Sequence, residues 1–272
     1  MPIPHHAAPA RKKNKWLATP PRSDVAARVF CLPFAGTGAG LLRQWPARLG
    51  DIELCRVQLP GRENRIREPH FTDFDSYAES TAEGLADALD RPYALFGHCM
   101  GALLAHRLAV RLAELPVRPP DRLIVSSSLP PHFPPAKRYR PPEPGAIGIY
   151  HPMMSDDELA EEMRRVARAQ GQQDILPELL PIAVAVLRKD LDACYAYAPR
   201  EPVPLDCPVV TIGWTRDPDV APEDMAEWRG YGTLTRYTLE GDKLSFIRAP
   251  QTLMTVLAEV CADIATEPGE RT

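Results

Sequence analysis

Cys99 is the residue of this chain best suited to nucleophilic chemistry. It stands at the centre of the motif Gly97-His-Cys-Met-Gly101. Residues 91–96 before the motif form a short apolar run, and residues 100–115 after it carry apolar side chains at helical spacing. A strand, a tight turn and a helix in this order predict a nucleophile elbow, with Cys99 projecting at the helix N-terminus. The alternative is a glycine-bounded helix start with a buried structural cysteine.

A general base for this nucleophile is missing from the last part of the chain, because no histidine follows His151. A serine hydroxyl is a poor nucleophile until a neighbouring base takes its proton. A thiol is already partly ionised at neutral pH and is intrinsically reactive. A cysteine therefore tolerates the loss of the histidine better than a serine would.

The composition indicates a globular, cytoplasmic protein. Its 272 residues fit one or two domains, and we predict one, because α/β folds often run long as a single unit. The formal net charge of −4 excludes a strongly basic nucleic-acid binder. The six cysteines form no C-x-x-C pair, so we expect free thiols and no metal site. No apolar stretch reaches the ~18 residues of a membrane span, so we expect no membrane contact.

The order of strand-like and helical patterns predicts an α/β fold. Strand-like runs cover residues 29–32, 52–59, 93–96, 123–125, 209–212 and 234–239. Helical patterns between several of them are clearest over residues 77–89, 100–115, 222–229 and 252–265. This alternation is typical of a mostly parallel sheet with helices on both faces.

One segment, from about residue 130 to residue 200, interrupts the alternation. Proline pairs open it, and residues 156–170 and 176–197 have helical patterns without a convincing strand. We predict a helical lid inserted into a single domain of residues 23–272. A flexible tail of residues 1–22 is expected to precede that domain.

Three motifs in the same order resemble those of type II thioesterases, the stand-alone α/β-hydrolases that serve nonribosomal peptide and polyketide synthases. Trp16-Leu17 followed by residues 28–36 resembles the opening strand and oxyanion loop of that family. Residues 57–65 resemble its second signature, and residues 96–101 its elbow. The resemblance spans roughly residues 16–265 and implies the α/β-hydrolase fold and activity on acyl thioesters.

The resemblance also implies the catalytic residues. The nucleophilic serine of the family falls on Cys99, its acid on Asp217, and Lys243 takes the place of its histidine. The helix N-terminus and the Lys243 ammonium would favour the Cys99 thiolate, and Asp217 would pair with Lys243. In the alternative, Lys243 is a solvated loop residue and Asp217 only caps the helix after Pro218.

Other residues remain candidates for the missing base. A shifted loop would bring in Asp242, and a movement of the lid would bring in His132 or His151. His70 lies in a polar loop, where we expect a solvated surface residue.

We expect this chain to keep the backbone groups that form an oxyanion hole. The backbone N–H groups of Met100, and of Phe34 or Ala35 in the first loop, would hold the negative oxygen of a tetrahedral intermediate. The stretch Gly36-Thr-Gly-Ala-Gly40 lacks the lysine of a P-loop and the G-x-G-x-x-G spacing. We interpret it as backbone geometry around the oxyanion loop.

Substrate selection is expected to lie in the lid. Its apolar side chains line an acyl pocket or simply pack in the core: Met153, Met154, Leu176, Leu179, Leu180, Val184 and Leu187. Two basic clusters, residues 137–140 and Arg164-Arg165, either meet an acidic carrier protein or a phosphopantetheine phosphate, or are solvated faces.

These observations predict an enzyme that takes an acyl or aminoacyl group from a carrier-protein thioester onto Cys99 in natural-product biosynthesis. Thiol attack exchanges one thioester for another, whereas release to water needs a base, so we expect acyl transfer or cyclisation over hydrolysis. The alternatives are an editing type II thioesterase that hydrolyses aberrant acyl groups, and a degenerate member that only binds the carrier protein. We expect no cofactor beyond the phosphopantetheine that carries the substrate. The expected partners are the acyl or peptidyl carrier protein and a small acyl substrate.

Overall fold

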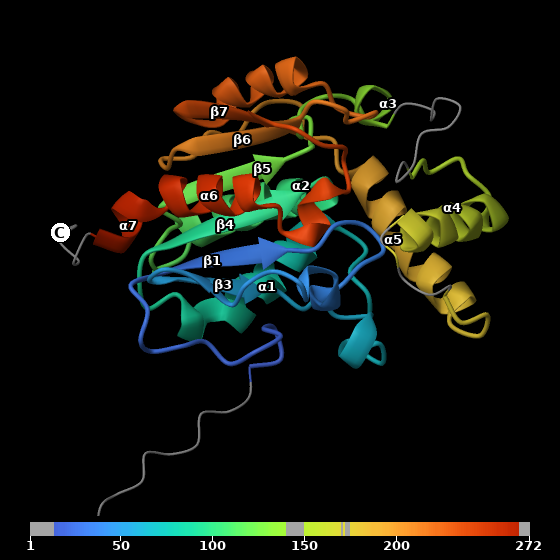
Figure 1. Ribbon diagram of the computed structural model, residues 1–272, viewed down its shortest axis with the longest axis horizontal. Coiled ribbons are helices and arrows are strands. Elements are labelled where there is room, and N and C mark those ends of the chain that lie inside the picture. The colour runs from blue at the N-terminus through green and yellow to red at the C-terminus, as the bar shows by residue number, and fades with distance from the viewer. Residues whose placement is uncertain (1–13, 140–149, 170, 172–174, 267–272) are drawn as a thin grey trace, which may run out of the picture.

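A seven-stranded sheet forms the centre of the computed structural model, which describes residues 14–139, 150–169, 171 and 175–266 (Figure 1). The strand order is β2-β3-β1-β4-β5-β6-β7, and every neighbouring pair is parallel except β2 with β3. The bounds are β1 Ala27–Leu32, β2 Arg48–Leu49, β3 Ile52–Arg56, β4 Tyr93–His98, β5 Arg122–Ser126, β6 Val209–Trp214 and β7 Leu234–Leu239. The predicted mostly parallel sheet is confirmed.

Two hydrophobic cores lie on opposite faces of this sheet, because successive side chains of a strand point to opposite sides. In β1, Phe30 packs in one core with α1 (Phe74–Leu85) and α2 (Met100–Ala113). Its neighbour Val29 packs in the other core with α6 (Gln251–Val260). Helices therefore cover both faces, as the alternation of the sequence predicts (Figure 1).

Only helices occur among the described residues between β5 and β6. They are α3 (Pro135–Arg138), α4 (Asp156–Ala169) and α5 (Leu180–Ala196). Figure 1 shows α4 and α5 beside the carboxyl ends of the strands. Helix α5 begins at Leu180, later than predicted. Pro181 fits the first turn of this helix, because the N–H groups there have no partner within the helix. The helical lid is thus placed over the edge of the sheet where the elbow ends.

Several element boundaries differ from the prediction. β3 ends at Arg56, before the expected end of that strand. The helix predicted over residues 222–229 is the 3-10 helix η4 (Pro222–Tyr231), and the one predicted over residues 252–265 breaks into α6 and α7 (Ala262–Thr266). Further 3-10 helices are η1 Ala39–Leu42, η2 Glu63–Arg65, η3 Ala86–Ala88 and η5 Ser245–Arg248.

The start of the described chain is packed against the domain. Trp16 and Leu17 are buried, with 7% and 5% of their surface exposed, and Leu17 forms an antiparallel bridge with Val57. The predicted flexible tail of residues 1–22 is therefore too long. Residues 1–13 lie outside the described residues.

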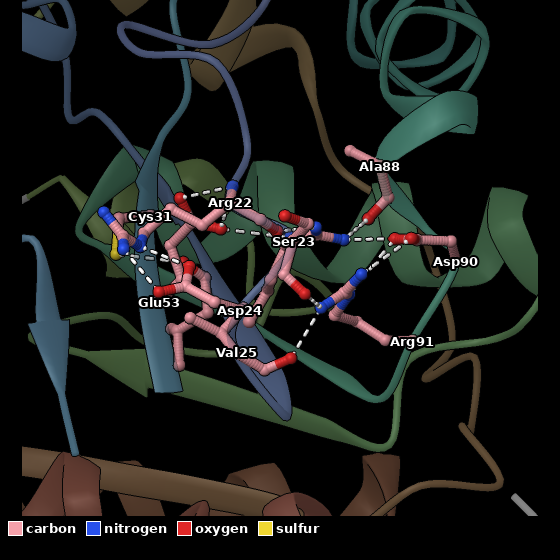
Figure 2. A network of polar contacts seen from close by, with 11 residues as sticks. Arg22, Ser23, Asp24, Val25, Cys31, Glu53, Ala88, Asp90 and Arg91 are labelled. Atoms are coloured by element: carbon pink, nitrogen blue, oxygen red, sulfur yellow. Dashed lines mark hydrogen bonds and ion pairs between the residues drawn. The ribbon is translucent and has the colours of Figure 1, made fainter. Parts of the chain in front are cut away.

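Arg28 is a fully buried cation at the amino end of β1. Figure 2 labels four residues that accept hydrogen bonds from it: Arg22, Glu53, Ala88 and Asp90. Its Nε donates to Glu53 at 3.1 Å, and its Nη atoms donate to the carbonyls of Ala88 at 2.8 Å and Arg22 at 2.7 Å. Nη1 also contacts the carboxylate of Asp90. A buried charge is tolerated only when it is paired in this way, so the network joins β1 to β3 and to the loop before β4.

Among the described residues, no helix has both the length and the apolar character needed to cross a bilayer. No group of three or more histidine, cysteine, aspartate or glutamate side chains in that part of the chain could hold a metal ion. All six cysteines are described, and each is free.

Candidate active site

Cys99 occupies a sharp turn between β4 and α2, with φ of 53° and ψ of −120°. Positive φ is unusual for a residue with a side chain and needs support from its surroundings. A Cβ at Gly97 would lie 2.0 Å from the carbonyl oxygen of Gly101, and one at Gly101 would lie 2.8 Å from that of Leu32. The amide of Cys99 donates to the carbonyl of Ser126 at 2.9 Å. The turn therefore has the geometry of a nucleophile elbow.

A small cavity of about 40 Å³ opens beside the half-buried Cys99. Met100, the first residue of α2, and Ala35 both line it. The Phe34 ring instead packs edge-on against Phe246, with ring centroids 5.9 Å apart. Of the two residues predicted in the first loop, Ala35 is the one that lines this cavity, so we take its N–H and that of Met100 as the candidate oxyanion donors. We call residues 33–37 the oxyanion loop.

Lys243 is buried in the same cavity and forms an ion pair with Asp219. Burial disfavours the ammonium, but attraction to Asp219, Cys99 and Asp217 outweighs burial and raises the pKa of Lys243 above its ordinary value. Lys243 is therefore a buried residue close to Cys99 whose ammonium form is favoured. The alternative of a solvated loop residue is wrong.

Asp217 lies near this cation but has other partners. One carboxylate oxygen accepts a hydrogen bond from the hydroxyl of Ser127, and the other accepts from the amides of Asp219 at 2.9 Å and Val220 at 3.2 Å. The predicted pairing of Asp217 with Lys243 is thus wrong, because Asp217 orders the turn that presents Asp219. Burial raises the pKa of Asp217, and Lys243 offsets this only in part.

The protonation of Cys99 also differs from the prediction. Burial raises the pKa of its thiol, while the Lys243 charge and the Met100 N–H lower it, with burial the larger effect. We expected a thiolate favoured by Lys243 and by the start of α2. The net direction is the opposite, so the thiol is the resting form and the thiolate is the minor, reactive one.

Neither histidine closest in sequence to the elbow provides a base. The His98 ring stacks on Phe246 at 3.8 Å between centroids, and its Nδ1 lies 3.1 Å from the Ser126 hydroxyl. Burial holds the pKa of His98 well below its usual value. His106 bonds through Nε2 to the carbonyl of Val203 at 3.0 Å, and it does not line the cavity at Cys99.

The other candidate bases are also held elsewhere. His132 Nδ1 lies 2.9 Å from the Tyr231 hydroxyl, and His151 Nδ1 accepts from the amide of Met153 at 3.1 Å. The Asp242 carboxylate accepts from the amide of Leu244 at 2.9 Å. None of these three lines the cavity at Cys99.

His70 is buried rather than solvated, with 5% of its side chain exposed, and so the prediction of a surface residue is wrong. Its Nε2 lies 2.9 Å from the carboxylate of Asp190, a residue of α5. Arg62 donates to the same carboxylate at 2.7 and 2.8 Å. The burial follows from this ion pair across the lid.

A larger cavity, about 610 Å³, lies between the oxyanion loop and helices α4 and α5. Tyr150 lines both this cavity and the one at Cys99. The larger cavity is walled mainly by apolar side chains of the lid: Met163, Val166, Ala167, Ile175, Leu179, Ile182, Ala183 and Val186. Its size and apolar walls suit an acyl group.

Most of the lid residues expected in an acyl pocket lie elsewhere. Leu179 lines the larger cavity, but Leu180, Val184 and Leu187 are buried in the core, and Met153 and Leu176 are exposed. Met154 packs against the core. Helical spacing alone does not tell which side of a lid helix faces a cavity, because both sides of α5 are apolar.

Among the described residues, three arginines of the predicted basic clusters are held in contacts within the protein. Arg138 is buried and donates to the carbonyl of Phe133 at 3.0 Å. Arg164 and Arg165 form ion pairs with acidic residues one turn earlier on α4. Arg140 lies outside the described residues. Arg138 thus has a structural role.

Sequence reasoning missed three residues at the site: Ser127, Tyr150 and Asp219. Ser127 follows β5, which neighbours β4, so parallel pairing predicts its place beside Cys99. Asp219 is the second aspartate of the loop after β6. The sequence therefore offers two candidate acids in this loop, and the prediction considered only Asp217. Tyr150 has no sequence signal, because its position depends on how the lid packs.

Comparisons with known proteins identify the family of this chain. The model of the thioesterase domain family matches residues 27–259, and the chain therefore belongs to that family. It is 32% identical over 265 residues to "Linear gramicidin dehydrogenase LgrE" of Brevibacillus parabrevis, covering 93% of each chain.

Solved structures agree with the fold. RedJ, a thioesterase from the prodiginine pathway of Streptomyces coelicolor, is 32% identical with a TM-score of 0.73, covering 95% of this chain and 96% of that one. BorB, a type II thioesterase from the borrelidin biosynthetic cluster, is 28% identical with the same TM-score of 0.73, covering 90% and 96%. The α/β-hydrolase fold is shared with these enzymes.

Proposed function

We propose that this protein transfers acyl or aminoacyl groups in nonribosomal peptide or polyketide biosynthesis, taking them from carrier-protein thioesters onto Cys99. The observation that carries the proposal is a cysteine in an intact elbow beside the buried pair Lys243–Asp219. The names of LgrE, RedJ and BorB support the biosynthetic setting. The substrate would be carried on phosphopantetheine, and the enzyme itself would need no cofactor.

The first step is thioester exchange. The Cys99 thiolate attacks the carbonyl carbon, the oxyanion is held by the N–H groups of Met100 and Ala35, and collapse expels the carrier thiolate, which takes a proton from solvent. One thioester replaces another, so the step is close to balanced in free energy. The Lys243 ammonium stabilises the attacking sulfur and the developing negative charge.

Release of the acyl group distinguishes transfer from hydrolysis. Water must lose a proton to attack the acyl-enzyme, and the raised pKa of Lys243 makes its ammonium form a poor base for that proton. None of the described histidines lines the cavity. A thiol, an amine or a stabilised carbanion delivered beside Cys99 needs less assistance, which favours transfer or cyclisation.

Hydrolytic editing is the second candidate, and one observation favours it. The Asp217 carboxylate accepts from the Ser127 hydroxyl, which lines the cavity at Cys99, and burial raises the pKa of Asp217 toward neutrality. A carboxylate with a raised pKa is a better base for a water molecule relayed through Ser127.

Intact-protein mass spectrometry with an acylated carrier protein tests the proposal. We expect an adduct on the wild-type protein and on Cys207→Ala, a control that removes another partly exposed cysteine, and none on Cys99→Ala. Release is then timed in buffer alone and with an added thiol or amine. Faster release with an acceptor supports transfer, equal release supports editing, and turnover by Cys99→Ala contradicts the nucleophile.

A further inference from the structure

Asp190 joins the lid to the oxyanion loop. This carboxylate comes from the middle of α5, and its Oδ2 accepts a hydrogen bond from the amide of Gly36 at 2.7 Å. Gly36 directly follows Ala35, a residue that lines the cavity at Cys99. A bond to Gly36 therefore fixes the peptide group that follows a candidate oxyanion donor.

Two side chains, Arg62 and His70, hold Asp190 in this position. Arg62 donates to both of its oxygens at 2.7 and 2.8 Å, and His70 Nε2 lies 2.9 Å from Oδ1. The same guanidinium donates to the carbonyl of Thr37 at 3.0 Å. The oxyanion loop is thus held at two neighbouring residues, at Gly36 by Asp190 and at Thr37 by Arg62.

Packing of the same helix adds a steric constraint. Gly36 has φ of +76°, which favours glycine, and a Cβ built there would lie 3.1 Å from Leu187 of α5. Leu187 is fully buried, and it lies one helical turn before Asp190. The absence of a side chain at Gly36 lets α5 approach the loop closely enough for the hydrogen bond.

We propose that Asp190 is a positioning residue that sets the oxyanion hole, so that the hole is formed only when α5 is docked on the oxyanion loop. Asp190 and Arg62 are each 4% exposed in their side chains. Undocking α5 would separate these buried charges and free the amide of Gly36, and breaking a buried pair is strongly unfavourable. The central part of α5 therefore belongs to the catalytic scaffold rather than to a freely opening lid.

The catalytic consequence rests on the proposed acylation of Cys99, whereas the structural link does not. We would compare Asp190→Asn with Asp192→Asn, a control that neutralises an exposed aspartate of the same helix. Hydrogen exchange of residues 33–38 should rise in Asp190→Asn and stay unchanged in the control. Unchanged exchange in Asp190→Asn would overturn the proposal, whether or not the protein acts on thioesters.

Acylation kinetics test the role in catalysis. Removing an oxyanion donor costs on the order of 100- to 1000-fold, so a displaced donor in Asp190→Asn should slow acylation by at least about tenfold. Alkylation of Cys99 by iodoacetamide forms no oxyanion and should proceed at the wild-type rate. Equal slowing of both reactions, or of neither, would overturn the positioning role.

A second, milder variant keeps the proposal testable if Asp190→Asn fails to fold. Arg62→Lys keeps the charge next to Asp190 but loses the two-point contact, and it should give a smaller rise in exchange and a smaller loss of acylation rate. If the wild-type protein itself is never acylated, the proposed function fails, while the exchange data still decide the link between Asp190 and Gly36.

Discussion

The ammonium of Lys243 forms its ion pair with Asp219, whereas Asp217, two residues earlier, accepts from Ser127 and from backbone amides. The two carboxylates therefore differ in role although they share one loop. Asp219 sets the charge beside the nucleophile, and Asp217 shapes the turn that places it there.

Removing the cation should make Cys99 harder to ionise. Lys243 lowers the pKa of the thiol, so Lys243→Ala should move the pH midpoint of iodoacetamide alkylation upward and slow acylation at neutral pH. Lys189→Ala, at an exposed lysine of α5, is the matched control. An unchanged midpoint would mean that the Lys243 charge does not reach the sulfur.

Neutralising Asp219 should change the pKa of Cys99 in the direction opposite to that of Lys243→Ala. Its charge raises the pKa of Cys99, and the charge of Asp217 does so less strongly. Asp219→Asn should therefore shift the alkylation midpoint downward, and Asp217→Asn should shift it by a smaller amount. Asp219→Asn should also lower the free energy of unfolding by about 1–3 kcal/mol, because a buried ammonium loses its charged partner. A larger shift in Asp217→Asn would reverse the assignment of the two carboxylates.

The rate of acylation should rise with pH in a single step. The thiolate fraction increases as pH approaches the raised pKa of Cys99, and Lys243 keeps its proton beyond that point because its pKa is raised as well. Burst kinetics between about pH 6 and pH 10 would show one rising limb. An inflection near pH 6.5, the usual range of histidine, would instead indicate an imidazole base from the lid.

Tyr150 should control the size of the acyl group. It lines both cavities, so Tyr150→Ala should join the small cavity at Cys99 to the larger one under the lid. Acylation by long-chain thioesters should then gain relative to acetyl thioesters. The comparison of kcat/KM across chain lengths measures this, with Tyr195→Ala, at an exposed tyrosine of α5, as the control. An unchanged preference would show that the acyl chain takes another path.

Stability depends on the buried cation at the other end of the sheet (Figure 2). Arg28→Met would leave Glu53 buried without its charged partner, at a cost of about 3–5 kcal/mol in unfolding free energy. Arg48→Met removes an ion pair from a 41% exposed arginine and should cost under about 1 kcal/mol. Urea denaturation measures both, and equal effects would contradict the role of burial.

Local patterns predicted much of this molecule. The elbow at Cys99 is encoded within a few residues, since the strand, the glycines and the helix are neighbours in sequence, and it appears where expected. The alternation of strands and helices likewise predicts the parallel sheet. The resemblance to type II thioesterases placed Lys243 at the position of the family's histidine, and it lines the cavity at Cys99.

Features that depend on distant contacts could not be predicted. His70 looks solvated in its polar loop, and only the arrival of Asp190 from α5 buries it. The choice of Asp219 over Asp217 depends on the backbone of one turn. Burial of the Cys99 thiol, which reverses the expected direction of its pKa, is likewise a property of the assembled lid and core.

The backbone geometry of the elbow depends on the residues around Cys99. The φ of 53° at Cys99 is set by its neighbours, with glycines where any side chain would collide with backbone, and not by the sulfur. A serine would be presented in the same place without refolding. The backbone of this turn therefore does not depend on which of the two side chains stands at position 99, and we expect that substitution to leave the fold constant.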